Sequence, residues 1–397
     1  MQKAFLIGMA ALLPLLIPEP SAAQSMREKD NVGGYITYGG TTPYSLKPAL
    51  TPSPLPVMPP REQQNPVNKR VIERANAYLD KYTATTAILL IDNGKILFEA
   101  YRGMGRPTSE FFSMSIGKSL TSLALGKAYC NGLLSSLDVK AQSILPELGD
   151  SNFGRSTVRQ LLMMSSGAYT PRQGGQPTYK GGIGRNPRTG KPFKGHSWPM
   201  RLGQASVADI LWGKFWQSTQ NKNPNQPGEI FMYKSGDILT ISKIIERVSG
   251  MSSAAYFNQT IWQYIGAART AHWESDFEGS TLANSSFQAT LRDWGRLAIW
   301  ILAARQKNDC FGAYLKQATS SQIPLTRSAS NSFKGYGYQW WTETRLAPGF
   351  WGLGYAGQKL AIDPDSGKIL LKFSYRKVRN ASRDIMRLFK TWQGGNS

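Results

Sequence analysis

The chemistry that this sequence could perform begins with Ser115 and Lys118, three residues apart at the start of a run with helical spacing. Side chains at positions i and i+3 lie on one face of a helix, so the hydroxyl and the amine come within reach of each other. A serine hydroxyl is a weak nucleophile until a base removes its proton, and a lysine can be that base only when its amine is neutral. Desolvation, together with the positive end of the helix, would have to lower the lysine pKa by about 3 units. The spacing therefore predicts a serine nucleophile with a lysine general base.

Other interpretations compete for this pattern. The Gly-Lys-Ser at 117–119 matches the end of a phosphate-binding P-loop, but that motif needs glycine where this chain has Phe112. Residues 374–377 also read Ser-x-x-Lys, yet they fall in a predicted strand, where side chains three apart point to opposite faces. Without any chemistry, Ser115 would cap the helix and Lys118 would be a surface charge.

A tyrosine could complete the proton transfer. Tyr-x-Asn/Ser occurs at 129–131, 233–235 and 256–258, and only the middle copy follows a turn and precedes a helix instead of lying within one. A loop position lets the phenol of Tyr233 project into a site, where it could exchange a proton with the serine and the leaving group. We therefore expect Tyr233 to be the third catalytic residue and the other two tyrosines to be half-buried residues of helices.

Hydrophobic patterning predicts that both ends of the chain build one sheet. The folded part opens with a helix over 68–81 and a hairpin whose turn is Asn93-Gly94, the strongest short hairpin signal. The remaining predicted strands cover 336–343, 350–364 and 367–376, and the remaining predicted helices cover 116–130, 236–248, 252–264, 290–304 and 382–393. We expect an α+β fold, in which a central antiparallel sheet domain (67–125 and 330–397) is flanked by helices and a mainly helical domain (126–329) is inserted.

The first residues have the composition of a signal peptide. Residues 1–23 combine an early lysine, an apolar run and a small-residue cleavage site that ends at Ala23. The apolar run of about 14 residues is shorter than the ~20 that a spanning helix needs, and an uncleaved anchor is the alternative. Residues 24–66 form a Pro-rich arm. We expect a periplasmic or secreted protein, in which Cys130 and Cys310 either pair or remain as two buried thiols.

The charge is strongly positive, with 47 Lys and Arg against 25 Asp and Glu. Seven of the basic residues lie in a Gly/Pro-rich segment, about 168–205, which contains no acidic residue. This segment is either a solvated basic loop or a surface for an anionic substrate, a cell-envelope polymer or a lipid headgroup. Nucleic acid is not expected, because no zinc-finger or RNP-like pattern accompanies the charge. His196 and His272 are too few for a three-histidine zinc site, and we expect neither a metal nor an organic cofactor.

Five sequence blocks, taken together with their order along the chain, resemble the serine β-lactamase-like family. This family includes class C β-lactamases, D-alanyl-D-alanine carboxypeptidases, esterases and 6-aminohexanoate-dimer hydrolases. The blocks are 115–118, 161–169, 227–250, 289–302 and 354–364. The stretch 272–280, followed by 290–297, looks closest to the 6-aminohexanoate-dimer hydrolase branch. The resemblance covers about residues 70–395 and implies a β-lactamase-like fold.

Site roles follow from this resemblance position by position. It implies that Ser115 is the nucleophile, Lys118 the general base and Tyr233 the proton relay, with Ser235 lining the site. The third motif of the family falls on 352–354, so Gly352 and Gly354 would edge the site.

The same alignment of motifs implies an oxyanion hole made by the backbone amides of Ser115 and Tyr355. The amide-hydrolysing branch implies that Tyr169 adds a hydroxyl over the site, the alternative being ordinary packing. Trp341 lies next to the third motif and would either line an apolar acyl pocket or pack in the core.

Two departures from the family pattern narrow the expected substrate. Gly352 stands where β-lactamases and carboxypeptidases place a cation, and Ser235 stands where asparagine is more usual. Both argue against β-lactam or D-Ala-D-Ala turnover, unless an arginine of the basic segment replaces the cation. We expect an exported serine hydrolase that cleaves a small or peptide-like amide or ester through a Ser115 acyl-enzyme. The alternative is a cell-wall or penicillin-binding module with little or no turnover.

Overall fold

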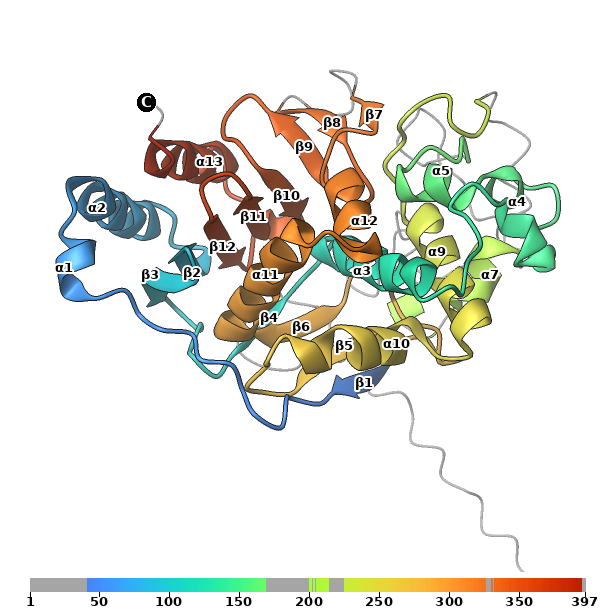
Figure 1. Ribbon diagram of the computed structural model, residues 1–397, viewed down its shortest axis with the longest axis horizontal. Coiled ribbons are helices and arrows are strands. Elements are labelled where there is room, and N and C mark those ends of the chain that lie inside the picture. The colour runs from blue at the N-terminus through green and yellow to red at the C-terminus, as the bar shows by residue number, and fades with distance from the viewer. Residues whose placement is uncertain are drawn as a thin grey trace, which may run out of the picture.

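An antiparallel sheet of eight strands, in the order β3-β2-β12-β11-β10-β9-β8-β7, forms the centre of the computed structural model (Figure 1). The structure describes residues 41–168, 200–201, 203, 205–213, 225–325, 330 and 332–394. The strands are β2 (Thr85–Asp92), β3 (Lys95–Tyr101), β7 (Ile323–Pro324), β8 (Phe333–Tyr336), β9 (Trp341–Thr344), β10 (Phe350–Leu353), β11 (Lys359–Asp363) and β12 (Lys368–Ser374). Because β2 pairs with β12, the two ends of the chain meet in one sheet, as predicted.

Helices cover both faces of this sheet. The helices α2 (Pro66–Lys81) and α13 (Ala381–Trp392) lie on one face, and α11 (Leu291–Gln306) and α3 (Ile116–Cys130) lie on the other (Figure 1). Successive side chains of a strand point to opposite faces, so one β2 residue packs with α2 and α13 and the next packs with α11. The predicted α+β architecture is confirmed.

A second sheet, in the order β1-β5-β6-β4, was not predicted. Its strands are β1 (Thr42–Leu46), β4 (Glu110–Phe112), β5 (Ala271–Ser275) and β6 (Phe287–Thr290). They are three to five residues long, too short for a periodic pattern to identify them. This sheet matters for function because β4 leads directly into the segment that carries Ser115.

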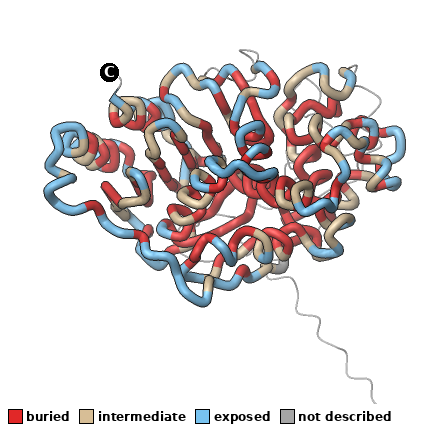
Figure 2. Tube along the Cα trace, in the orientation of Figure 1, coloured by how far each residue is buried: buried red, intermediate tan, exposed pale blue. Residues whose placement is uncertain are grey.

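The part of the chain between α3 and β7 contributes further helices besides α11, several of which pack against α3 (Figure 1). Its helices are α4 (Asn152–Arg155), α5 (Val158–Leu162), α7 (Val207–Leu211), α9 (Ser235–Ser249), α10 (Ser253–Thr260) and α12 (Cys310–Ala318). Further short elements are α1 (Pro60–Gln63), η2 (Ala141–Ser143), η3 (Pro146–Leu148) and η4 (Trp262–Tyr264). Buried positions follow the strands of the large sheet and α3, which therefore pass through the core (Figure 2).

Two predicted strands are each split by a turn. The predicted strand 336–343 is interrupted between β8 and β9, where Gln339 adopts a positive φ of 68°. The predicted strand 350–364 is interrupted by the 3-10 turn η5 (Tyr355–Gly357), where Ala356 has a φ of 61°. At both positions the left-handed residue turns the backbone out of the extended conformation and the strand stops, so the prediction of one continuous strand was wrong at both places.

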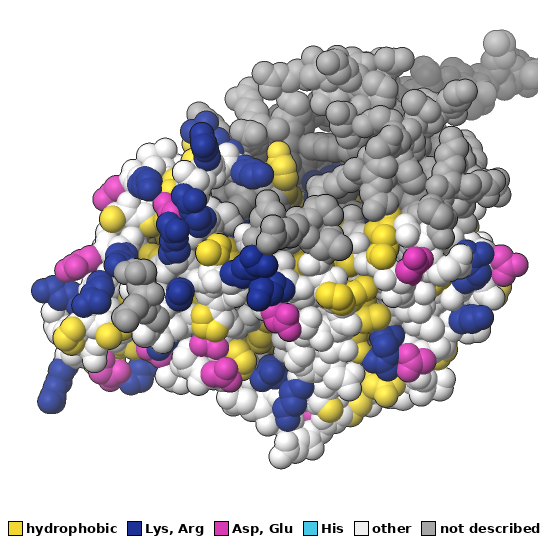
Figure 3. All heavy atoms as spheres, turned by 90° about the horizontal axis from the view of Figure 1, so that it is seen from above, with side chains coloured by type: hydrophobic (Ala, Val, Ile, Leu, Met, Phe, Trp, Pro, Cys, Tyr) yellow, Lys and Arg dark blue, Asp and Glu magenta, His cyan; other side chains and the backbone are white. Residues whose placement is uncertain are grey.

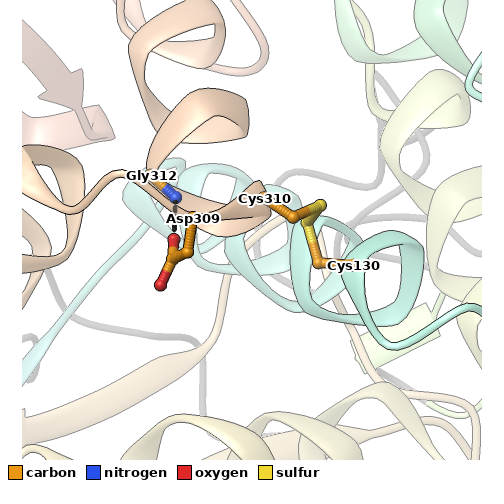
Figure 4. Close-up of a disulfide and its surroundings, with 4 residues drawn as sticks. All are labelled: Cys130, Asp309, Cys310 and Gly312. Atoms are coloured by element: carbon orange, nitrogen blue, oxygen red, sulfur yellow. Dashed lines mark hydrogen bonds between the residues drawn. A yellow bond between two sulfur atoms is a disulfide. The ribbon is translucent and has the colours of Figure 1, made fainter.

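Cys130 and Cys310 form a disulfide that joins the end of α3 to the start of α12 (Figure 4). The Cα atoms are 5.7 Å apart, and the bond links positions 180 residues apart in sequence. The carboxylate of Asp309 caps α12 through the amide of Gly312 at 2.7 Å. Of the two alternatives for these cysteines, pairing is the one observed.

Within the described ranges, no helix combines the length and the hydropathy that crossing a membrane requires. The predicted signal peptide and residues 24–40 of the predicted arm lie outside these ranges, whereas the rest of the arm is described and contains β1 and α1. Lys and Arg side chains are prominent on the face seen from above, among acidic and apolar side chains (Figure 3).

Candidate active site

Ser115 lies at a sharp bend between β4 and α3. Met114 has a φ of 46°, a left-handed conformation that is unfavourable for a residue other than glycine and that turns the chain from strand to helix. Ser113 anchors the approach, because its backbone amide donates to Phe287 O at 2.7 Å and its hydroxyl accepts from Phe287 N at 3.0 Å. The side chain of Ser115 makes no capping hydrogen bond to α3, so the helix-cap interpretation is wrong.

Lys118 faces Ser115 one helical turn along. Its Nζ lies 2.9 Å from Ser115 Oγ and 2.7 Å from the backbone carbonyl oxygen of Asn284. The residue is only 3% exposed, so it is not the surface charge of the alternative interpretation. The predicted nucleophile and the predicted base are therefore in hydrogen-bond contact.

Tyr233 comes from the segment before α9 and reaches the same place. Lys118 Nζ lies 5.2 Å from the centre of its ring. The ring also packs against Trp341 of β9, with ring centroids 5.5 Å apart, in a cluster that includes Phe231 and Tyr336. Trp341 is thus in contact with the predicted relay, as a support for its ring. The other two Tyr-x-Asn tyrosines lie in α3 and α10, as expected.

Buried charges fix the segment that presents Tyr233 and Ser235. Between them, Lys234 has an extended backbone and a buried side chain, and its Nζ lies 3.4 Å from Asp237 Oδ2. Ser166, in the second of the sequence blocks, donates its hydroxyl to Asp237 Oδ1 at 2.7 Å. Burial lowers the pKa of Lys234 and raises the pKa of Asp237. This buried pair anchors the backbone between Tyr233 and Ser235 at the start of α9.

Asn284 joins the two motifs and was missed by the sequence reasoning. Its carbonyl accepts from Lys118, and its Nδ2 donates to Ser235 Oγ at 3.1 Å. The turn that carries it packs closely on α3, since a Cβ at Gly117 would lie only 3.0 Å from Ser285 O. No local signal marks Asn284, because the turn lies between two short strands that were themselves not predicted.

The third predicted motif, on β10, lies against the chain that enters α3. A Cβ at Gly354 would lie 2.6 Å from the backbone oxygen of Ser113, and a Cβ at Gly352 would lie 3.1 Å from Ile116 Cγ2. Glycine at these positions allows the strand to approach Ser115 closely. The next residue, Tyr355, begins η5, and its side chain is 66% exposed.

The basic segment is described only at its end. Arg201 is buried, and its Nη2 donates to Ser285 Oγ at 2.8 Å and to Ser286 Oγ at 2.9 Å. Its Nε lies 3.8 Å from Glu274 Oε2, and burial raises the pKa of Glu274 to about 7. Arg201 is therefore a packed residue and not part of a solvated loop.

The other predictions about this segment fall largely outside the described residues. Tyr169 and His196 both lie outside the described residues. His272, by contrast, is described, and its Nδ1 lies 2.8 Å from Glu110 Oε2, so it is a hydrogen-bonded residue of the small sheet. Among the described residues, no three His, Cys, Asp or Glu side chains are grouped as a metal site would require.

Residues 70–391 match the family model described as Beta-lactamase, which spans most of the chain and every element of the site above. This chain belongs to the β-lactamase family. The resemblance stated from the five blocks is therefore confirmed, and the family is one of hydrolases.

Individual relatives of this β-lactamase-family chain agree with that assignment. The 6-aminohexanoate-dimer hydrolase of Paenarthrobacter ureafaciens is 24% identical over 306 residues, covering 74% of this chain and 73% of that protein. A candidate 6-aminohexanoate-dimer hydrolase from Bacillus anthracis has a similar structure, with a TM-score of 0.68, 20% identity and coverage of 89% of this chain and 90% of that one. An octameric penicillin-binding protein homologue from Pyrococcus abyssi follows with a TM-score of 0.62, 18% identity and coverage of 83% and 78%. These two structures support the fold.

Proposed function

We propose that this member of the β-lactamase family is an exported serine hydrolase that cleaves an amide or ester through an acyl-enzyme on Ser115. The observation that carries the proposal is the 2.9 Å contact between Ser115 Oγ and Lys118 Nζ, with the ring of Tyr233 beside the same amine. A nucleophile within hydrogen-bond reach of a base that is itself held by a third group is the arrangement nucleophilic catalysis needs.

The proposed reaction has two halves. Neutral Lys118 takes the proton of Ser115 while Oγ attacks the substrate carbonyl carbon, and the resulting oxyanion accepts hydrogen bonds from the backbone amides of Ser115 and Tyr355. The tetrahedral intermediate collapses to the acyl-serine ester, and Tyr233 passes the proton to the departing amine or alcohol. A water then loses a proton to the same pair and attacks the ester, which releases the acid and restores the serine hydroxyl.

The supporting evidence favours an open-chain amide or ester over a β-lactam. Position 352 is glycine, and its missing side chain leaves no cation on this strand to bind a substrate carboxylate. The relative from Paenarthrobacter ureafaciens is named for hydrolysis of the 6-aminohexanoate dimer. We therefore propose a small or peptide-like substrate with a linear acyl chain, acted on without a metal or an organic cofactor and without nucleic acid as a partner.

Export is the second part of the proposal. The composition of residues 1–23 suggests a cleavable signal peptide, and the Cys130–Cys310 disulfide suits the periplasm or the extracellular space, where such bonds persist. The basic segment 168–205 could then contact an anionic cell-envelope polymer. Mass spectrometry of the protein recovered from the native cell envelope tests this directly: a mature chain that begins near Gln24 supports export, and an intact Met1 in the cytoplasmic fraction contradicts it.

Active-site labelling tests the catalytic part. Incubation with a fluorophosphonate should add one adduct mass to the wild-type protein, and Ser115→Ala should gain none. A hydrolysis panel of short-chain esters, linear ω-amino acid amides, D-Ala-D-Ala peptides and a chromogenic β-lactam, with Ser115→Ala as the blank, identifies the substrate class. Labelling of the alanine variant would refute the assignment. A labelled wild type that turns over nothing in the panel, yet binds peptidoglycan saturably, would favour the binding module instead.

A further inference from the structure

Two side chains of β12 bind the turn η5, whose first residue, Tyr355, supplies the second of the two proposed oxyanion donors. Ser374 donates its hydroxyl to the carbonyl oxygen of Ala356 at 2.6 Å. Lys372 Nζ donates to the next carbonyl, that of Gly357, at 3.2 Å and to Ser374 Oγ at 2.7 Å. The two side chains thus bind successive carbonyls of η5 and each other.

Further contacts lock the turn to the end of β12. The side-chain amide of Gln358 donates to Ser374 O at 2.7 Å and accepts from Ser374 N at 2.8 Å. The turn is closed by the amide of Gly354, which donates to Gln358 O at 2.9 Å. These contacts hold Ala356 in its left-handed conformation, which is unfavourable unless the surroundings impose it.

The glycine of the turn makes room for the amine. Gly357 has a φ of 96°, and a Cβ there would lie 3.0 Å from Lys372 Nζ and 3.2 Å from Ser374 Oγ. The two side chains therefore pack directly against the turn backbone, with no space for any other group between them.

Burying the Lys372 amine costs desolvation free energy, so packing alone is a poor explanation for a lysine at this position. Lys372 is 3% exposed, and its partner across the β11–β12 ladder is a second buried lysine, Lys359. Burial, together with the smaller effect of the neighbouring Lys359, lowers the pKa of Lys372 to about 7. In the described part of the chain, neither amine forms an ion pair with a carboxylate. An apolar residue would fill the same space without the desolvation penalty.

We propose that Lys372 and Ser374 are positioning residues for hydrolysis: by binding the carbonyls of Ala356 and Gly357 they fix the direction of the Tyr355 amide toward the developing oxyanion. The inference rests on the proposed function, because it concerns the donor that the proposed acyl transfer uses. An oxyanion donor is effective only when it is already oriented at the start of the reaction. Two hydrogen bonds to the carbonyls that follow the donor supply this orientation.

The test compares variants of the full-length protein. Lys372→Met removes both the donor and the charge, Lys372→Gln keeps an uncharged donor on a side chain that is one bond shorter, and Ser374→Ala removes one hydroxyl with little change in volume. We expect kcat to fall about ten- to a hundredfold in the Met and Ala variants, less than the loss of an oxyanion donor itself, with KM nearly unchanged. Lys372→Gln should recover part of kcat. Lys359→Met is the matched control, since it removes the adjacent buried amine without removing a contact to the turn.

Two readouts separate positioning from loss of folded protein. The final amplitude of fluorophosphonate labelling counts intact sites, and kcat is expressed per labelled site. Each variant is also assayed on an oxo-ester and on the matching thionoester, in which sulfur replaces the oxygen that becomes the oxyanion. A misdirected donor should reduce the preference for the oxo-ester, whereas simple destabilisation leaves this preference unchanged.

Each outcome decides something different. If the wild type is labelled and active, but Lys372→Met and Ser374→Ala keep both kcat per site and the oxo-ester preference, the positioning role is wrong and the hydrolase proposal stands. Equal losses in Lys359→Met would also overturn it, because they would point to general packing of the buried pair. If the wild type is neither labelled nor active, the proposed function fails, and the positioning role fails with it.

Discussion

Asn284 and Lys118 are 166 residues apart in sequence, and the carbonyl oxygen of one accepts a hydrogen bond from Nζ of the other at 2.7 Å. The same amine contacts Ser115 Oγ, so the turn between β5 and β6 sets where the proposed base sits. The side chain of Asn284 extends this link to Ser235. One residue outside the sequence motifs therefore connects the first motif to the second.

Lys118→Met should abolish most turnover without unfolding the protein. Methionine fills a similar volume but cannot accept the serine proton, so we expect kcat/KM to fall by about 10²–10⁴. Lys127→Met, on the same helix, is the control: Lys127 packs over the rings of Trp300 and Phe311, far along α3 from the serine. Steady-state hydrolysis and thermal unfolding of both variants provide the measurement. Equal activity of the two would contradict a role for Lys118 as the base.

The Asn284–Ser235 contact should behave as one unit. Asn284→Ala and Ser235→Ala each break the 3.1 Å hydrogen bond, and we expect each to lower kcat/KM about tenfold, equivalent to about 1.4 kcal/mol. If the hydroxyl acts through the asparagine, the double variant should lose little more than either single one. Strict additivity in this double-mutant cycle would show that the two side chains act independently.

Adding one methyl group should distinguish Gly352, in β10, from Gly354, which follows the end of that strand. In Gly354→Ala the new Cβ would meet the backbone oxygen of Ser113 at 2.6 Å, and backbone cannot move aside. In Gly352→Ala it would meet the side chain of Ile116 at 3.1 Å, which can shift slightly. We expect Gly354→Ala to destabilise the fold by about 1–3 kcal/mol and to impair turnover, with a smaller effect for Gly352→Ala. Urea unfolding and hydrolysis rates test the order, and the reverse order would show that β10 approaches Ser113 less closely than described.

Removal of the disulfide should lower stability much more than activity. It closes a loop of 180 positions and lies at the opposite end of α3 from Ser115. The Cys130→Ser/Cys310→Ser variant should lose about 2–5 kcal/mol of unfolding free energy while its kcat below the unfolding transition stays close to that of wild type. A reducing agent should lower the melting temperature of the wild type and leave the double variant unaffected. A reductant-insensitive wild type would mean that the bond is absent in solution.

Glu274 should make stability depend on pH below neutrality. Burial raises its pKa from 4.5 to about 7 in the folded protein, although Arg201 acts in the opposite direction. Between these values the folded state holds a proton that the unfolded chain has released, so its contribution is complete below about pH 4.5 and is lost as the pH rises to about 7. The change is on the order of 3 kcal/mol, at about 1.4 kcal/mol for each pKa unit. Glu274→Gln should flatten the unfolding free energy over this range, and an unchanged slope would contradict the raised pKa.

The sequence by itself was sufficient to predict the long helices and strands and to locate the first and second motifs. Helices such as α3 and α9 have enough turns for their apolar spacing to be recognised, and the turn before α9 distinguished Tyr233 from its two competitors. The pair Ser115 and Lys118 could be predicted because their contact is local, one helical turn apart. The ordered blocks identified the family, since their order is a property of the chain and not of its folding.

Only the tertiary structure decided the contacts between distant segments. The small sheet, the role of Asn284 and the burial of Arg201 all depend on short strands or single residues, which carry no periodic signal. The pairing of Cys130 with Cys310 was open for the same reason, because 180 residues of intervening chain allow many geometries. Whether two side chains meet across such a separation depends on the packing of the whole core, and that packing is what brings Lys372 under the turn of Tyr355.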